Sequence, residues 1–143
     1  MDLKLRMEMA GRNLLGALSE SHGYLPYWNL HVDEDHKAKF NMTSPSHNIG
    51  RWWDAILRLE DATGFLIPDH QEEGMLRNTQ LFFGNPDQMC FAPIQPEYGE
   101  PIFETHSLRE GLLALNALVR YRGSEWAAEQ GHRMLETVAR LSD

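Results

Sequence analysis

Residues 105–123 read THSLREGLLALNALVRYRG, and an earlier stretch, residues 46–64, repeats their pattern as SHNIGRWWDAILRLEDATG. The two stretches align without a gap at an offset of 59 residues, which places His106 on His47 and Gly123 on Gly64. Each stretch runs from a small polar residue through a histidine, a helix cap and an apolar helix to a closing glycine. A period of this length is typical of stacked helical hairpins. We therefore expect the two stretches to form equivalent helices in two successive hairpins.

The composition predicts one acidic domain with an ordinary hydrophobic core. The chain has 143 residues, of which 42% are hydrophobic and 24% are charged, and its formal net charge is -8. This charge disfavours nucleic acid and anionic membranes as partners. The single cysteine, Cys90, excludes an intrachain disulfide. Together with the lack of a secretory signal pattern near the start, it leads us to expect a cytoplasmic location.

The hydrophobic periodicity predicts an all-α fold of about five helices. Their expected ranges are 2–21, 48–64, 69–84, 107–123 and 124–141. Two of them open on pairs with capping-box spacing, Asp69 with Glu72 and Ser107 with Glu110. The fourth helix is apolar enough that we expect it to be buried nearly all round. The residues expected on the buried faces of the other helices include Ile49, Trp52, Trp53, Ile56, Leu59, Met75, Leu76, Thr79, Phe82, Phe83, Ala127, Met134, Leu135 and Val138.

The connections between these helices alternate between long and short. Residues 24–45 and 85–104 form the long connections, and both are expected to be irregular. Antiparallel neighbours place alternate connections at opposite ends of a helical array. Both long connections should therefore lie at one end, together with the N-termini of the second and fourth helices, which we interpret as inner helices.

The paired segments resemble the (α/α) barrel, or six-hairpin toroid, of glucoamylase-like, unsaturated glucuronyl hydrolase-like and related carbohydrate-active proteins. The pattern also suits lanthionine-cyclase-like and terpenoid-cyclase-like toroids. The resemblance covers most of the chain and implies a site at the N-terminal ends of the inner helices, within residues 24–51 and 85–109. Six hairpins at this period would need about 350 residues. We therefore expect either the N-terminal part of a longer toroid or a domain that forms a homodimer through its open flank.

The HVDEDH segment, residues 31–36, gathers acidic side chains in the first long connection. If it is extended, Asp33 and Asp35 share one side with His31. Glycoside hydrolysis needs two carboxyl groups that flank the scissile bond, so Asp33, Asp35 and Glu104 are the candidate catalytic residues under the resemblance. An exposed acidic loop is the simpler interpretation. Metal binding through His31, Asp33 and His36 is a third.

Two histidines and two arginines recur at the starts of the inner helices. His47 and His106 suit hydrogen bonding either to sugar hydroxyls or to a backbone carbonyl of their own loops. Arg51 and Arg109 oppose the helix dipole, so each should have a carboxylate partner, with Asp33, Asp35 and Glu104 as the candidates, or an anionic ligand such as an acidic sugar.

The aromatic candidates lie close to the same end of the expected array. Tyr27 and Trp28 have rings that suit the apolar face of a pyranose, although packing of the loop onto the barrel would also explain them. Trp52 is expected either in the core or at the edge of the cavity. With His31, His47, Arg51, His106 and Arg109, these residues form the predicted substrate-binding set.

The sequence thus favours a glycoside hydrolase-like segment of an (α/α)-barrel protein that contributes substrate-contacting loops for a carbohydrate or another small molecule. No cofactor or metal is expected in this interpretation. The alternatives are a non-catalytic helical-repeat interaction or dimerisation domain, and a metal-dependent enzyme that uses the HVDEDH loop.

Overall fold

The computed structural model of the chain describes residues 2–26, 29–32, 34–36, 38–41, 45–91 and 105–142. Its helices are α1 (Leu3–Gly16), α2 (Ile49–Thr63), α3 (Asp69–Phe82), α4 (Thr105–Arg122) and α5 (Glu125–Leu141). The predicted all-α class is confirmed, with short strands as the only sheet structure in the described residues. In the same part of the chain, no helix combines the length and the apolar character that crossing a membrane requires.

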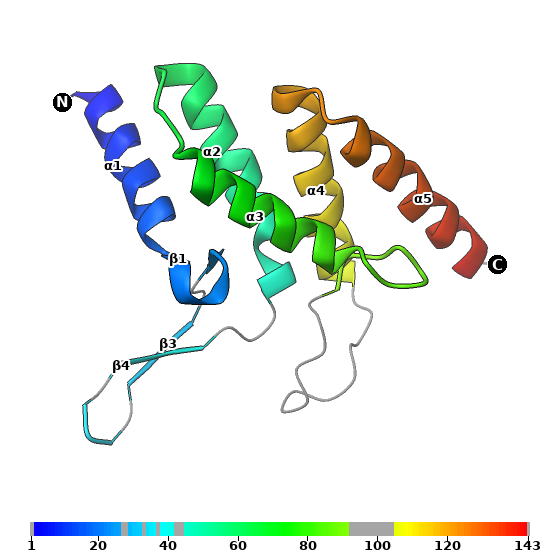
Figure 1. The fold of residues 1–143 in the computed structure, drawn as a ribbon, viewed down its shortest axis with the longest axis horizontal. Helices are drawn as coiled ribbons and strands as arrows, with labels where there is room; N and C mark the ends of the chain where they lie inside the picture. The colour runs from blue at the N-terminus through cyan, green and yellow to red at the C-terminus, as the bar shows by residue number, and fades with distance from the viewer. Residues whose placement is uncertain are drawn as a thin grey trace.

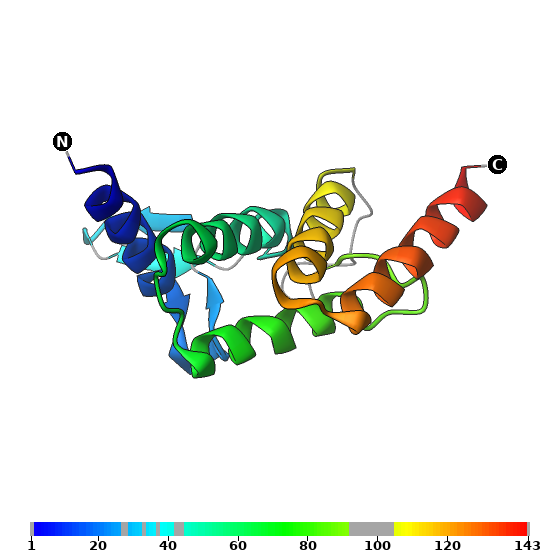
Figure 2. The same cartoon turned by 90° about the horizontal axis from the view of Figure 1, so that it is seen from above.

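α2 and α4 form the centre of the array (Figures 1 and 2). They run side by side in the same direction and make the most extensive contact between any two helices described. α1 packs against α2, and α5 packs against α4. In Figure 1, α1 and α3 finish at the end where α2 and α4 begin, so both longer connections join helices at that end, as predicted.

The first connection is more regular than the sequence suggested. α1 ends at Gly16 rather than near residue 21, and β1 (Leu18–Ser19) then pairs with β2 (Leu25–Pro26) around a 3-10 turn, η1 (Glu20–His22). The Ser19 hydroxyl lies 2.8 Å from His22 Nδ1, and Gly23 closes the turn with a φ of 63°. A second antiparallel pair joins β3 (Asn29–Val32) to β4 (Ala38–Asn41), and η2 (Pro45–His47) precedes α2. The prediction of an irregular segment was wrong here, because strands this short show too few alternations to be recognised.

The apolar face of α2 forms the core as predicted. Trp52, Trp53 and Ile56 are buried, and the two indole rings meet edge to face at 5.0 Å. Trp53 Nε1 donates to the Thr79 hydroxyl at 2.8 Å, and that hydroxyl donates to the Met75 carbonyl at 2.7 Å. This chain of bonds ties α2 to α3 and satisfies the polar atoms buried between them.

Neither predicted capping box forms. Pro68 is the N-cap residue of α3, so Asp69 already lies inside the helix and makes no cap. Glu72 instead binds Arg122 of α4, which also pairs with Glu60 of α2. Hydrogen bonding to Glu72 is the main cause of the raised pKa of Arg122. One guanidinium group therefore joins three helices at the C-terminal end of α4.

The second capping box is replaced by a longer helix. α4 begins at Thr105, so Ser107 is a helical residue and does not cap it. α4 is also not buried all round, because its stripe of Arg109, Asn116 and Val119 is exposed. Leu135 of α5, predicted to be buried, is 53% exposed. No element in the described part of the chain covers these side chains.

Gly50 sets the distance between α2 and α4. A Cβ atom added to Gly50 would lie 2.2 Å from the Glu110 carbonyl oxygen and 2.8 Å from Leu113 Cβ. We predict that Gly50→Ala lowers the free energy of unfolding by about 2 kcal/mol or more, because backbone atoms cannot move aside as a flexible side chain can. Gly131→Ala in α5 is the control, since its nearest neighbour would be 4.0 Å away. Urea unfolding should show that Gly131→Ala stabilises the protein by about 0.5–1 kcal/mol. If both variants lowered the free energy of unfolding equally, the close approach of α2 and α4 at Gly50 would be contradicted.

The buried thiol of Cys90 should make the free energy of unfolding depend on pH in the alkaline range. Burial, with the nearby charge of Glu110, raises the pKa of its thiol from 9.0 to about 12. Above about pH 9 the unfolded chain therefore releases this proton while the folded protein keeps it, so stability falls as pH rises. The difference in unfolding free energy between wild type and Cys90→Ala should shrink by about 1 kcal/mol between about pH 9 and pH 10. If that difference in unfolding free energy stayed constant over this range, folding would not raise the pKa of the Cys90 thiol.

Candidate functional site

The N-terminal ends of α2 and α4 bring together a cluster of charged and aromatic polar side chains. We call it the Arg–His cluster, and it consists of His47, Arg51, His106, Arg109 and Glu110. η2 delivers His47, the first turn of α2 delivers Arg51, and the first two turns of α4 deliver the rest. Four of the five are sequence-predicted site residues.

Glu110 is the centre of the cluster and has no exposed surface. Its Oε1 accepts hydrogen bonds from Arg51 Nε at 2.9 Å and Arg109 Nη2 at 2.8 Å. Its Oε2 accepts from the backbone N–H of Arg51 at 3.0 Å. Asn48, the N-cap residue of α2, makes no side-chain cap, so Glu110 caps α2 from the neighbouring helix. Both oxygens are engaged, which makes Glu110 a structural anion rather than a proton donor.

Glu110 is the member of the cluster whose role the sequence interpretation missed. Arg51 and Arg109 were expected to need carboxylate partners, and the partner that the structure describes for both is Glu110. Two of the three expected partners, Asp33 and Glu104, lie outside the described residues. A signal was present, because the offset of 59 residues places Glu110 opposite Arg51. Opposite charges at equivalent positions of parallel neighbouring helices can reach each other across the interface.

His106 links the two arginines. Its Nε2 lies 2.9 Å from Arg51 Nη2 and 3.1 Å from Arg109 Nη2. A guanidinium group only donates, so Nε2 accepts these bonds in the tautomer that carries its proton on Nδ1. In the other tautomer, Nε2–H would donate to the His47 carbonyl oxygen, which lies 3.1 Å away. The His47 and His106 rings lie 4.4 Å apart, which places the two repeat-equivalent imidazoles face against face with a tilt of 35°.

The cluster has more positive than negative charge. Two guanidinium groups share one carboxylate, which leaves an excess of one positive charge when the imidazoles are neutral. The Arg51 and Arg109 side chains are 53% and 58% exposed. The positive ends of two helix dipoles add to this field. The arrangement therefore suits an anionic group that approaches from solvent.

The other predicted site residues are not brought to this cluster by the described structure. Trp52 takes the first of its two expected places: it is buried in the core, where its Nε1 points to the Leu14 carbonyl at 3.4 Å, because its side of α2 faces α1. Asp35 lies in the exposed turn between β3 and β4. His31 belongs to β3, with no side-chain placement described. The remaining predictions lie outside the described residues: Tyr27, Trp28, Asp33 and Glu104.

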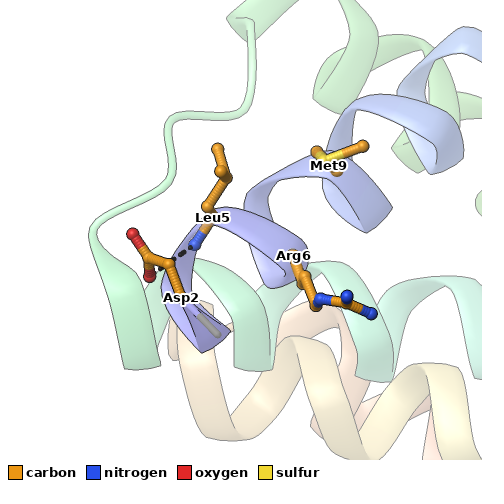
Figure 3. Close-up of a pocket in the computed structure, with 4 residues that line it drawn as sticks. All are labelled: Asp2, Leu5, Arg6 and Met9. Atoms are coloured by element: carbon orange, nitrogen blue, oxygen red, sulfur yellow. Dashed lines mark hydrogen bonds between the residues drawn. The ribbon is translucent and has the colours of Figure 1, made fainter.

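Two other places in the described structure lack the features of a site. Within the ranges that the structure describes, no three His, Cys, Asp or Glu side chains lie where they could hold a metal ion. The metal hypothesis for HVDEDH depends on Asp33, outside those ranges, and stays a prediction. The hollow beside α1 is lined only by Asp2, Leu5, Arg6 and Met9, as Figure 3 shows. It is one face of a single helix, and it lies at the end of α1 remote from the Arg–His cluster.

Comparisons of the chain with models of protein families, with curated proteins and with solved structures found no match. The functional interpretation therefore depends on the geometry of the Arg–His cluster and on the resemblance carried by the paired segments.

We predict that Glu110→Gln lowers the free energy of unfolding by about 2 kcal/mol, because it removes the charge that three buried or half-buried donors share and places an amide N–H₂ among them. Urea unfolding followed by circular dichroism measures the effect. Glu129→Gln is the matched control, since that carboxylate is exposed and makes a 3.5 Å pair with Arg133 on α5. It should leave stability nearly unchanged. If the two variants behave alike, Glu110 does not hold α2 and α4 together.

Proposed function

We propose that the chain forms one rim of a carbohydrate-binding site in a protein of the (α/α)-barrel type, and that the sugar bound there carries a carboxylate. The observation that supports this most directly is the pair of half-exposed guanidinium groups that share a single buried carboxylate. They lie at the N-terminal ends of two parallel helices, where the resemblance places the site.

The hydrogen-bonding capacity of the arginines favours a carboxylate over a neutral group. Within the described residues, the Nη1 groups of Arg51 and Arg109 donate to no protein acceptor. A sugar carboxylate can accept from these planar donors in a paired geometry that hydroxyl groups cannot match. Because the whole chain has a net charge of -8, an anion would be attracted only where the local field is positive.

The two histidines could contact the hydroxyl groups of a sugar whose carboxylate binds the arginines. In the tautomer whose Nε2 accepts from the arginines, the Nδ1–H of His106 is a donor of the kind that sugar hydroxyls accept. The ring of His47 lies beside it and widens the same surface. Glu110 would take no direct part, since both of its oxygens are occupied, and it would hold the arginines in place.

Glycosidic hydrolysis is the reaction that we propose for the whole site. It requires two carboxyl groups, for which Asp33, Asp35 and Glu104 remain the candidates on the sequence alone. The cluster itself would bind and orient the substrate, and the acid and base would come from the long connections.

The binding proposal predicts a strong preference between two matched sugars. Methyl glucuronide and methyl glucoside differ only in a carboxylate that replaces a hydroxymethyl group. We expect isothermal titration calorimetry to show binding of the glucuronide at least about 10-fold tighter, since charge-assisted hydrogen bonds contribute about 1.5–3 kcal/mol. Arg109→Gln should remove most of that preference and leave the weak binding of the glucoside unchanged.

Arg77→Gln provides the control for this measurement. Arg77 is an exposed arginine of α3 whose only described ion pair is a 3.8 Å contact with Glu73. Its substitution changes the net charge by the same amount without touching the cluster. Equal loss of binding in both variants would point to general electrostatic attraction, and equal affinity of wild type for both sugars would exclude a carboxylate site. Inorganic phosphate as a competitor distinguishes recognition of any anion from recognition of a sugar acid.

A further inference from the structure

The Nε2 atom of His106 has more hydrogen-bond neighbours than a single ring nitrogen can satisfy. Arg51 Nη2 lies 2.9 Å from it, and Arg109 Nη2 lies 3.1 Å from it. The carbonyl oxygen of His47 also lies 3.1 Å away. Because a guanidinium group only donates and a carbonyl oxygen only accepts, Nε2 would have to accept from the first two neighbours and donate to the third. It can do only one of these at a time.

Each of the two states of Nε2 leaves some contacts unfavourable. When Nε2 is unprotonated, it accepts from the arginines, and its lone pair faces those of the His47 carbonyl oxygen. When Nε2 carries a proton, it donates to that oxygen, and its N–H opposes the N–H groups of Arg51 and Arg109. The arginines therefore favour the unprotonated state, and the carbonyl oxygen favours the protonated one.

The charges of the cluster add to the preference for the unprotonated, neutral ring. In the described part of the chain, the charged and titratable groups that face His106 are His47 from η2, Arg51 from α2, and Arg109 and Glu110 from α4. Glu110 Oε1 is 4.0 Å from Nε2 and already accepts from both arginines. With two guanidinium groups and one carboxylate, a protonated imidazole would raise the excess positive charge from one to two.

An anion bound by the two arginines would reverse this preference. Hydrogen bonds to an ionised acceptor are stronger than those to a neutral nitrogen, so the anion would compete with Nε2 for the Nη2 protons. The half-exposed side chains of Arg51 and Arg109 can turn outward, while their bonds to Glu110 hold their positions. The charge of the anion would also offset that of a protonated imidazole. Nε2 of His106 would then be free to bind a proton from solvent and donate it to the His47 carbonyl oxygen.

We propose that His106 takes up a proton when the Arg–His cluster binds an anion, so that the anion binds more tightly at lower pH. The inference rests on the proposed function in one respect, which is that the cluster binds an anion. By linkage, the proton and the anion strengthen each other's binding by the same factor. Imidazole is the side chain that changes its charge between about pH 5 and pH 8, so the effect should appear in that range.

Two anions that stay ionised above about pH 6 allow the proton uptake to be measured: inorganic sulfate and methyl glucuronide. Isothermal titration calorimetry is performed at one pH in Bis-Tris and in Tris, two cationic buffers with different ionisation enthalpies. The difference between the two apparent binding enthalpies gives the number of protons taken up. We expect about half a proton or more near pH 7, which corresponds to an affinity that rises about 10-fold from about pH 8 to pH 6.

Three histidine variants locate the proton. His106→Gln removes the titrating nitrogen, so its affinity for either anion should no longer depend on pH between about pH 6 and pH 8. His47→Gln keeps the backbone carbonyl that receives the Nε2–H, so proton uptake should persist. His132→Gln replaces an exposed histidine of α5 and is the matched control, which should behave as wild type does. Uptake that persists in His106→Gln would place the proton on another group and overturn the inference.

The two anions separate a failure of this inference from a failure of the proposed function. If methyl glucuronide binds wild type without net proton uptake, the inference is overturned and the proposed sugar site stands. If sulfate binds with proton uptake and methyl glucuronide does not bind, the inference is supported and the sugar is excluded. If neither anion binds, both are overturned. These measurements use the wild-type chain, so they do not depend on the folding of any variant.

Discussion

The structure depends on a buried carboxylate shared between two parallel helices. A charge removed from water is tolerated only when opposite charge and hydrogen bonds surround it. Glu110 meets that condition in one register, in which Arg51 supplies both its Nε and its backbone N–H. Gly50, the residue before Arg51, receives the backbone of Glu110 in the same register. If α4 shifted along α2, an α2 residue larger than glycine would face the Glu110 backbone. The Glu110 carboxylate would also lose its hydrogen-bond donors.

A second ion cluster fixes the other end of the same pair of helices. Arg122 joins α4 to Glu60 of α2 and to Glu72 of α3. Between the two clusters, small and apolar side chains such as Ala114 and Ala117 fill the interface. Apolar contact alone is nondirectional. The ion clusters at both ends specify the relative direction of α2 and α4 and the position of one helix along the other. The rigid pair then holds the guanidinium groups of the Arg–His cluster in place, with their outer faces in solvent.

The sequence predicted what depends on periodicity and little of what depends on a distant partner. Helix α2, its apolar face and its closing Gly64 follow from local pattern, and all were found as expected. The capping-box spacing of Ser107 and Glu110 is a local pattern too, but it failed because Arg51 offers the carboxylate a better set of donors. The exposure of Leu135 could not be predicted either, since an apolar residue at a helical period indicates a buried face only where something covers it.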